Sequence, residues 1–245
     1  MLLCANFNEL ELALLLHIDT ALEQASVFLS YDGEIITLKQ STEQKNHASF
    51  IQVAIKELLA EAKETLQNIN AISVVNGPGS YTGLRVGLAT AKGICYAINK
   101  PLITLNTLEL MALSLINNSN KIVANNENNL PILFCPLIDA RRMEVFTALY
   151  NVNLQALIPP TAMVLNEQSF EAELKNNTII FNGNGYLKLK QVLNNINAIF
   201  TSVNYNYSTI ITAAENKYTQ SNFADIAYSE PFYIKEFYST DHHKK

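Results

Sequence analysis

The sequence predicts an α/β protein made of two similar units. Each half of the chain opens with short apolar strands and continues with alternating helices and strands, the order expected for a sheet covered by helices. Residues 117–129 are dominated by Asn, Ser and Glu and separate the two halves. In the first half, residues 76–85 form a glycine-rich link between a strand and a helix, which is the most distinctive feature of the chain.

The first half is expected to begin with three antiparallel strands. Asp32-Gly33 is a typical hairpin turn between the second and third of them. Apolar residues at helical spacing predict an amphipathic helix over residues 50–66. Further helices are expected over residues 84–98 and from Thr107, which is a suitable cap. The predicted strands cover residues 12–18, 25–29, 34–38, 71–75 and 101–105.

The second half is expected to repeat this order in a weaker form. A turn over residues 139–142 joins its first two strands, and a second glycine turn at residues 182–185 precedes a helix over residues 186–193. The asparagine-rich segment cannot bury much apolar surface, which makes it the best candidate for a domain boundary. The predicted strands cover residues 132–138, 144–150 and 178–181. The predicted subdomains are residues 12–116 and 131–236, with a linker over 117–130 and tails at 1–11 and 237–245.

The composition indicates a globular protein of the cytoplasm. Hydrophobic residues make up 49% of the 245 positions, which is ample for a packed core. The formal charge of -5 argues against a surface that binds nucleic acid without help, since such surfaces need clustered Lys and Arg. Cys4, Cys95 and Cys135 are scattered in apolar surroundings, as expected for reduced thiols. Neither a signal peptide nor a membrane span is predicted at the start of the chain.

The glycine-rich link has two interpretations. Gly77 and Gly79 permit positive φ and close backbone approach, and Ser80 can cap the helix that follows. Free amides at the start of a helix attract anions, but the spacing matches neither the phosphate loop of nucleotide-binding proteins nor the dinucleotide fingerprint. The link is therefore either a tight structural turn or an anion cradle.

The helix after this turn is apolar nearly all round, because Arg85 and Lys92 are its only charged residues. Such a helix is buried on more than one face, either as a core helix or as one that docks a partner. A second helix is expected to approach at Gly87, Ala91 and Gly93. The face toward its own sheet is expected to carry Val86, Ala89, Gly93 and Ala97.

Several runs of the sequence, taken together, resemble the TsaB (YeaZ) family, whose members take part in making threonylcarbamoyladenosine beside the anticodon of tRNAs. The resemblance extends over roughly residues 14–236. It implies the actin-like ATPase (ASKHA) architecture of two RNase H-like subdomains, which agrees with the two strand-rich halves. The matching runs are residues 17–20, 77–93, 139–145, 182–186 and 230–235.

The resemblance implies a non-catalytic dimerisation and scaffold subunit that pairs with the catalytic relative TsaD, an assembly that the ATPase TsaE joins. It implies no firmly bound cofactor, with ATP or ADP at the interface to the catalytic subunit and tRNA reached only through the complex. An apolar helix pair is also compatible with a homodimer of the isolated chain. The expected partner-binding residues are Ile51, Ile55, Leu58, Arg85, Leu88, Lys92 and Cys95.

The alternative is a nucleotide-binding or ATP-hydrolysing enzyme of the actin-like group that acts on its own. Asp19 stands where that fold places a magnesium or phosphate contact, although it is equally interpreted as a turn-capping residue. Ala21 replaces the serine common in the family, which weakens a phosphate loop at this strand end. Asp139 with Arg141 and Arg142 forms either an anion site or a surface turn with local ion pairs. The candidate nucleotide or anion ligands are Asp19, Thr20, Gly77, Gly79, Ser80 and Asp139.

No metal site is predicted. His17, His47, His242 and His243 are not paired at the helical spacing of a metal-binding pair. His17 lies in a strand and is expected to be a core or edge residue. Ser80 has no histidine placed to activate it, so it is expected to be a helix cap rather than a nucleophile.

Overall fold

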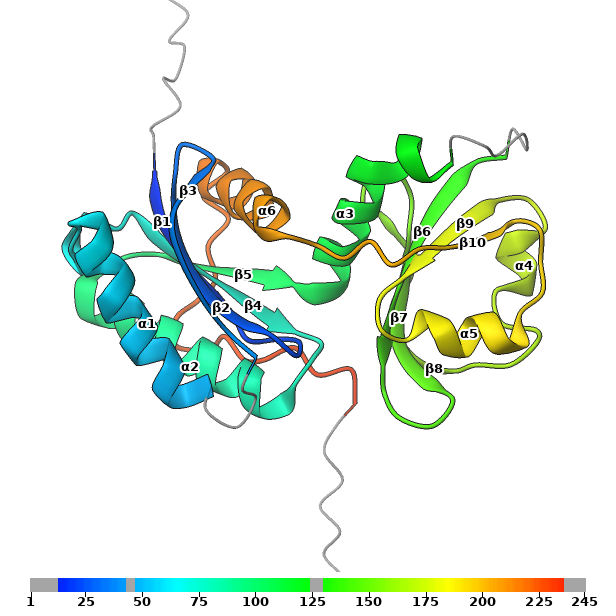
Figure 1. The fold of residues 1–245 in the computed structure, drawn as a ribbon, viewed down its shortest axis with the longest axis horizontal. Coiled ribbons are helices and arrows are strands. Elements are labelled where there is room, and N and C mark those ends of the chain that lie inside the picture. The colour runs from blue at the N-terminus through cyan, green and yellow to red at the C-terminus, as the bar shows by residue number, and fades with distance from the viewer. Residues whose placement is uncertain (1–12, 43–46, 124–129, 236–245) are drawn as a thin grey trace, which may run out of the picture. The chain divides into compact units, whose positions relative to one another are not determined.

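The computed structural model describes residues 13–42, 47–123 and 130–235. These residues form two compact units. The first unit takes the described residues up to Leu110 together with Asn206–Pro231, and the second takes Met111–Tyr205 together with residues 232–235. Each unit is built around one five-stranded sheet (Figure 1).

The sheet of the first unit has the strand order β3-β2-β1-β4-β5. The first three strands are antiparallel neighbours, whereas β4 runs parallel to β1 and β5 parallel to β4. The strands are β1 (Leu14–Asp19), β2 (Ala25–Tyr31), β3 (Glu34–Ser41), β4 (Ala71–Gly77) and β5 (Leu102–Asn106). The helices are α1 (His47–Ala62), the short 3-10 helix η2 (Leu66–Asn68), α2 (Tyr81–Ile98) and α6 (Tyr207–Thr219).

The sheet of the second unit has the order β8-β7-β6-β9-β10, with the same pattern of directions as the first sheet. The predicted repeat of one α/β architecture is therefore confirmed. Helix α3 (Thr107–Ile122) begins in the first unit and continues into the second. The strands are β6 (Ile132–Asp139), β7 (Glu144–Tyr150), β8 (Ala156–Val164), β9 (Thr178–Asn182) and β10 (Ala198–Phe200). The remaining helices are α4 (Glu171–Leu174) and α5 (Tyr186–Val192).

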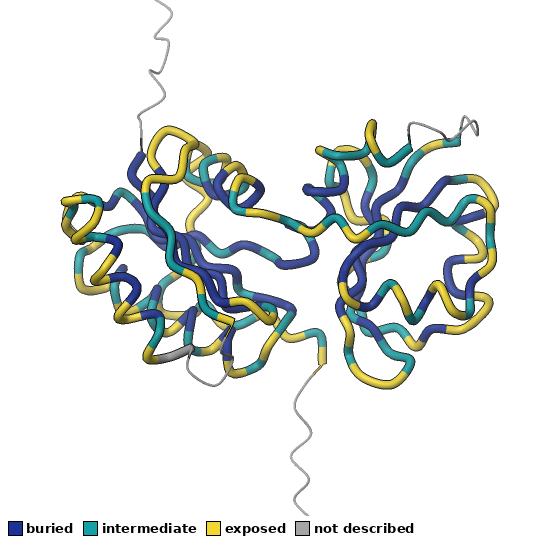
Figure 2. Tube along the Cα trace, in the orientation of Figure 1, coloured by how far each residue is buried: buried dark blue, intermediate teal, exposed yellow. Residues whose placement is uncertain are grey.

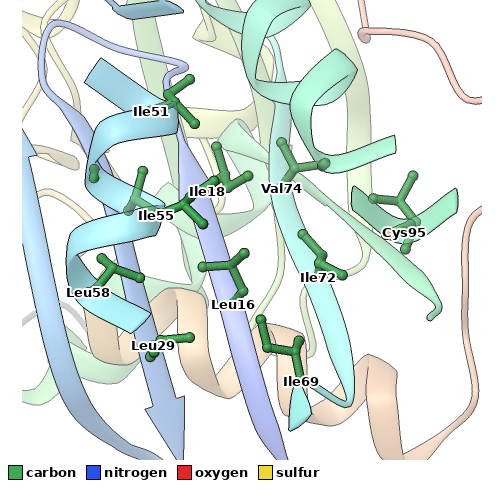
Figure 3. Packing of buried hydrophobic residues seen from close by; sticks show 14 of the residues in the cluster. Leu16, Ile18, Leu29, Ile51, Ile55, Leu58, Ile69, Ile72, Val74 and Cys95 are labelled. Carbon is green, nitrogen blue, oxygen red and sulfur yellow. The ribbon is translucent and has the colours of Figure 1, made fainter. Parts of the chain in front are cut away.

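The core of the first unit lies between its sheet and the helices α1 and α2, which are neighbours (Figures 1 and 3). Ile51 and Leu58 of α1 point toward Leu16 and Ile18 of β1 (Figure 3). Each such side chain contributes about 1.5–3 kcal/mol when fully buried. In the second unit, α4 and α5 cover the equivalent face of the sheet, so both cores have the same design.

Several elements differ from the sequence prediction, and the short helices η2 and α4 were not predicted. Strand β8 was not predicted because it contains Pro159-Pro160, which an edge strand tolerates and a central strand does not. Strand β10 was not predicted because it is only three residues long. Helix α6 was not predicted because its sequence has no clear helical pattern. Helix α3 continues to Ile122, into the segment predicted as linker.

The division of the chain also differs from the predicted subdomains, because residues 206–231 return to the first unit. There α6 contacts β5 and β3. Order along the sequence alone could not indicate this return. The predicted tails at 1–11 and 237–245, together with Cys4, His242 and His243, lie outside the described residues. Over the three described ranges, no helix is both long and apolar enough to cross a membrane.

His17 ties together the three central strands of the first sheet. Its ring is fully buried and stacks on Phe28 of β2 with 4.4 Å between ring centroids. Its Nδ1 lies 2.6 Å from the Ser73 hydroxyl on β4, and its Nε2 lies 2.7 Å from the Ser30 hydroxyl on β2. Burial lowers the pKa of His17 to about 3, so the imidazole is neutral in the folded protein. The expectation of a core histidine is confirmed.

This burial predicts a specific dependence of stability on pH. Between pH 6.5 and about 3 the unfolded chain protonates His17 and the folded chain does not, so the free energy of unfolding falls as the pH falls. The contribution is complete above pH 6.5, and about 2 kcal/mol of it is lost at pH 5. Urea unfolding of wild type and His17→Gln at pH 7.5 and pH 5 measures this. We expect the variant to lose less stability than wild type on acidification, and equal losses would contradict the assignment.

Candidate functional site

The turn after β1 packs directly against the glycine-rich start of α2. The Ser80 amide donates a hydrogen bond to the Ala21 carbonyl at 2.7 Å, and the Thr20 hydroxyl donates to the Gly83 carbonyl at 2.7 Å. A Cβ atom on Gly79 would lie 2.1 Å from the Ala21 oxygen, and one on Gly83 would lie 2.1 Å from the Thr20 oxygen. Only glycine allows the backbones to approach this closely.

This contact uses amides that an anion would need. Ser80 is the N-cap of α2 and its hydroxyl accepts a hydrogen bond from the Gly83 amide at 3.3 Å, as predicted from the sequence. The Ser80 amide is bound to Ala21. Gly77, at the end of β4, has a φ of +117, which also requires glycine. The geometry therefore favours the structural interpretation of this turn over the anion cradle.

Asp19 lies at the end of β1 with 6% of its surface exposed. Its carboxylate accepts a hydrogen bond from the Ala21 amide at 3.0 Å, the geometry of a turn-capping aspartate. Tyr207 of α6 is nearby, and burial followed by the charge of Asp19 raises the pKa of this phenol. Among the described residues, no three His, Cys, Asp or Glu side chains gather closely enough to hold a metal ion.

Most of the predicted partner-binding side chains face the interior. They belong to the core of the first unit and cannot reach a partner while that unit is folded. This corrects the sequence prediction for Ile51, Ile55, Leu58, Leu88 and Cys95, which are at most 6% exposed. Burial also raises the pKa of the Cys95 thiol to about 12.

The two charged residues of α2 behave differently from each other. Arg85 is exposed and its guanidinium lies 4.1 Å from the centre of the Tyr81 ring. Lys92 is half-buried, and its ammonium donates to the Ala227 and Ser229 carbonyls at 3.1 and 2.9 Å. Lys92 therefore fastens the segment that follows α6 onto α2, whereas Arg85 can face a partner.

The predicted sheet-facing side of α2 is largely wrong: Val86 packs against the core, but Ala89, Gly93 and Ala97 are exposed. Gly87 and Ala91 are buried, and a Cβ atom on Gly87 would contact the side chains of Ile18 and Val74. Figure 2 shows exposed and buried residues alternating along the trace of this helix. Its exposed residues are Thr82, Arg85, Ala89, Gly93, Tyr96 and Ala97. Val53 on the neighbouring α1 is 56% exposed.

A second polar cluster lies at the end of β6 in the second unit. The Asp139 carboxylate accepts hydrogen bonds from the Lys188 ammonium and the Arg141 amide, both at 2.7 Å. Partial burial opposes its charge, but these bonds outweigh the burial and lower the pKa of Asp139. Asp139 is therefore ion-paired with Lys188 of α5, 49 positions later, and not with an arginine of its own turn as predicted.

Arg141 and Arg142 form the tip of the turn between β6 and β7, and both are exposed. Their φ angles are +71° and +48°, a left-handed conformation that costs an L-residue roughly 1–2 kcal/mol. Glu144 at the start of β7 pairs with Lys235 at 2.5 Å. Neither guanidinium makes a hydrogen bond or ion pair with a described residue.

Residues 36–238 match the family model of TsaD, described as tRNA N6-adenosine threonylcarbamoyltransferase. The match covers most of the chain. This chain belongs to the TsaD family. A relative in Bacillus subtilis, the tRNA threonylcarbamoyladenosine biosynthesis protein TsaB, is 27% identical over 185 residues, which are 74% of this chain and 76% of that protein. The protein of the same name in Haemophilus influenzae is 37% identical over 98 residues, or 40% of this chain and 41% of that one.

The fold is also found in solved structures. A Pseudomonas aeruginosa protein with similarity to peptidase YEAZ superposes with a TM-score of 0.72 at 19% identity, covering 91% of this chain and 100% of that one. The resemblance to TsaB (YeaZ) and the architecture of two RNase H-like subdomains are therefore confirmed.

The close approach at the start of α2 predicts opposite effects of two alanine substitutions on one helix. Gly83→Ala forces a methyl group against the Thr20 carbonyl and is expected to lower the free energy of unfolding by about 1–3 kcal/mol. Gly93→Ala meets nothing within 4 Å and is expected to raise it by up to about 1 kcal/mol. Chemical denaturation of both variants tests this. Equal effects would show that the contact does not constrain the helix.

Proposed function

We propose that this chain is a non-catalytic subunit that pairs with a tRNA N6-adenosine threonylcarbamoyltransferase to make threonylcarbamoyladenosine, the modified adenosine next to the anticodon. Family membership and the relatives named TsaB support the pathway. The exposed face of α2 supports a role in pairing. In this assembly the ATPase TsaE joins the pair, and ATP or ADP binds at the interface with the catalytic subunit.

The observation that carries the proposal is the composition of the exposed α2 face. Ala89, Gly93 and Ala97 recur every four residues, so they form one line along the helix. A Cβ atom on Gly93 would have no neighbour within 4 Å, which leaves room for the backbone of a partner helix. Beside this line, Tyr96 is 84% exposed, and an exposed tyrosine is a common anchor of protein interfaces.

A glycine in the middle of a helix also needs an explanation. It costs roughly 1 kcal/mol relative to alanine, and no described residue lies within 4 Å of the place where a Cβ atom on Gly93 would be, so no close approach within the described fold requires glycine here. Close packing by a partner would offset that cost. The same surface is compatible with a homodimer of the isolated chain, in which a second copy takes the partner's place.

The non-catalytic part of the proposal rests on the strand-end geometry of the first unit. Asp19 caps its own turn, and the amides of Ser80 and Gly83 are bound within the protein. An actin-like enzyme acting alone would need these groups for the phosphates and their metal ion. The alternative of an independent ATPase is therefore less well supported by the arrangement of these residues.

Gly93→Glu tests the pairing surface without disturbing the core. Glutamate is a better helix former than glycine, so the fold is expected to persist, but its charge and bulk block close helix packing. We expect the affinity for the transferase encoded by the same genome to fall at least about 100-fold, measured by titration calorimetry. Gln191→Glu, an exposed helical position in the second unit, is the matched control.

If Gly93→Glu binds the transferase with wild-type affinity, the exposed face of α2 is not the pairing surface. A second result would support the alternative instead. If the purified chain alone hydrolyses ATP at a rate that Asp19→Asn abolishes, the chain is an enzyme in its own right.

A further inference from the structure

We propose that the turn between β6 and β7 is a direct phosphate contact for tRNA, made by the guanidinium groups of Arg141 and Arg142. This inference rests on the proposed function, because a complex that modifies tRNA supplies the ligand. It assigns direct RNA binding to a chain whose overall charge of -5 argued against a nucleic-acid-binding surface.

The local balance of charge differs from that of the whole chain. The two carboxylates that flank the turn each have a lysine partner: Asp139 pairs with Lys188 at 2.7 Å, and Glu144 pairs with Lys235 at 2.5 Å. Neither carboxylate is therefore paired with an arginine of the turn. With the two ion pairs neutral, the turn carries two uncompensated positive charges on an acidic protein.

The backbone of the turn indicates that arginine is present for its side chain. Arg141 and Arg142 are adjacent and both have positive φ, a conformation that glycine or asparagine adopts with less strain. Their guanidinium groups make no hydrogen bond or ion pair with a described residue. No side-chain contact within the described fold therefore offsets the backbone strain. Because no contact within the described fold offsets this strain, we infer that the two arginine side chains bind a ligand outside the chain.

The turn is also held firmly enough to present these groups. The Asp139 carboxylate accepts from the Arg141 amide, the Glu144 amide donates to the Arg141 carbonyl at 3.0 Å, and the Ala140 amide donates to the Glu144 carbonyl at 3.1 Å. Only the long side chains remain to be ordered when a ligand binds. This fixed backbone lowers the entropic cost of binding.

The chemistry of the turn fits phosphate better than a protein surface. Guanidinium presents a planar set of donors that matches two phosphate oxygens. No large apolar side chain of residues 139–144 is exposed, whereas a protein interface needs an apolar centre. Exposed arginines paired only with carboxylates would add little affinity. A polyanion gains more, because each contacted phosphate releases counterions.

The test is the double variant Arg141→Asn/Arg142→Gly, assayed as the full chain with its transferase partner. The probe is a transcribed tRNA with adenosine 3′ of the anticodon, and binding is measured by fluorescence anisotropy over a range of salt concentrations. We expect the affinity to fall roughly tenfold and the slope of log affinity against log salt to decrease by about 2. The melting temperature is expected to rise by a few degrees, because the left-handed conformation suits the new residues.

The control Lys121→Gln/Lys175→Gln removes two positive charges from exposed positions, one on α3 and one directly after α4. Equal tRNA affinity and salt slope in the arginine variant and this control would overturn the proposal, as would a wild-type complex that binds no tRNA. Loss of pairing with the transferase in the arginine variant would also overturn it, because the turn would then be a protein contact.

Size-exclusion chromatography of wild type with the transferase separates this proposal from the proposed function. Absence of a heterodimer there would mean that the proposed function fails. The arginine contact would then be judged by the same loss of tRNA affinity in the chain alone.

Discussion

The fold depends on a close approach between the first strand of each sheet and a glycine turn further along the chain. In the first unit the carbonyls of Thr20 and Ala21 lie where side chains of Gly83 and Gly79 would stand. In the second unit the carbonyl oxygen of Leu137 lies where a side chain of Gly183 would stand. The same oxygen accepts a hydrogen bond from the Gly185 amide. Both sheets thus use bare backbone contact to place the helix that follows the turn.

This contact has two consequences for function in the first unit. The glycine turn is occupied by the chain itself, which takes away amides that a bound nucleotide would use. Helix α2 is also fixed with Gly87 and Ala91 against the sheet and with Ala89 and Gly93 outward. A sequence segment that resembles a ligand loop therefore serves to hold a helix whose outer face is suited to packing against another protein.

The sequence was sufficient to predict the repeated α/β architecture, the Ser80 cap and a buried His17, because each depends on local pattern. The predicted orientation of α2 was wrong, because it gave weight to the small residues Ala89, Gly93 and Ala97. The buried face instead follows the helical spacing of Leu84, Leu88, Ala91 and Cys95. The pairing of Asp139 with Lys188, 49 positions later, depends on tertiary structure that no local pattern encodes.

The glycine turn of the first unit is a packing element rather than a nucleotide loop. The most direct measurement is an NMR titration of the isotope-labelled full chain, without partner, with magnesium ATP up to millimolar concentration. We expect the amide resonances of Ser80 and Gly83 to stay in place, because both amides are hydrogen-bonded within the protein. Saturable shifts of these two resonances would contradict the packing role of the turn.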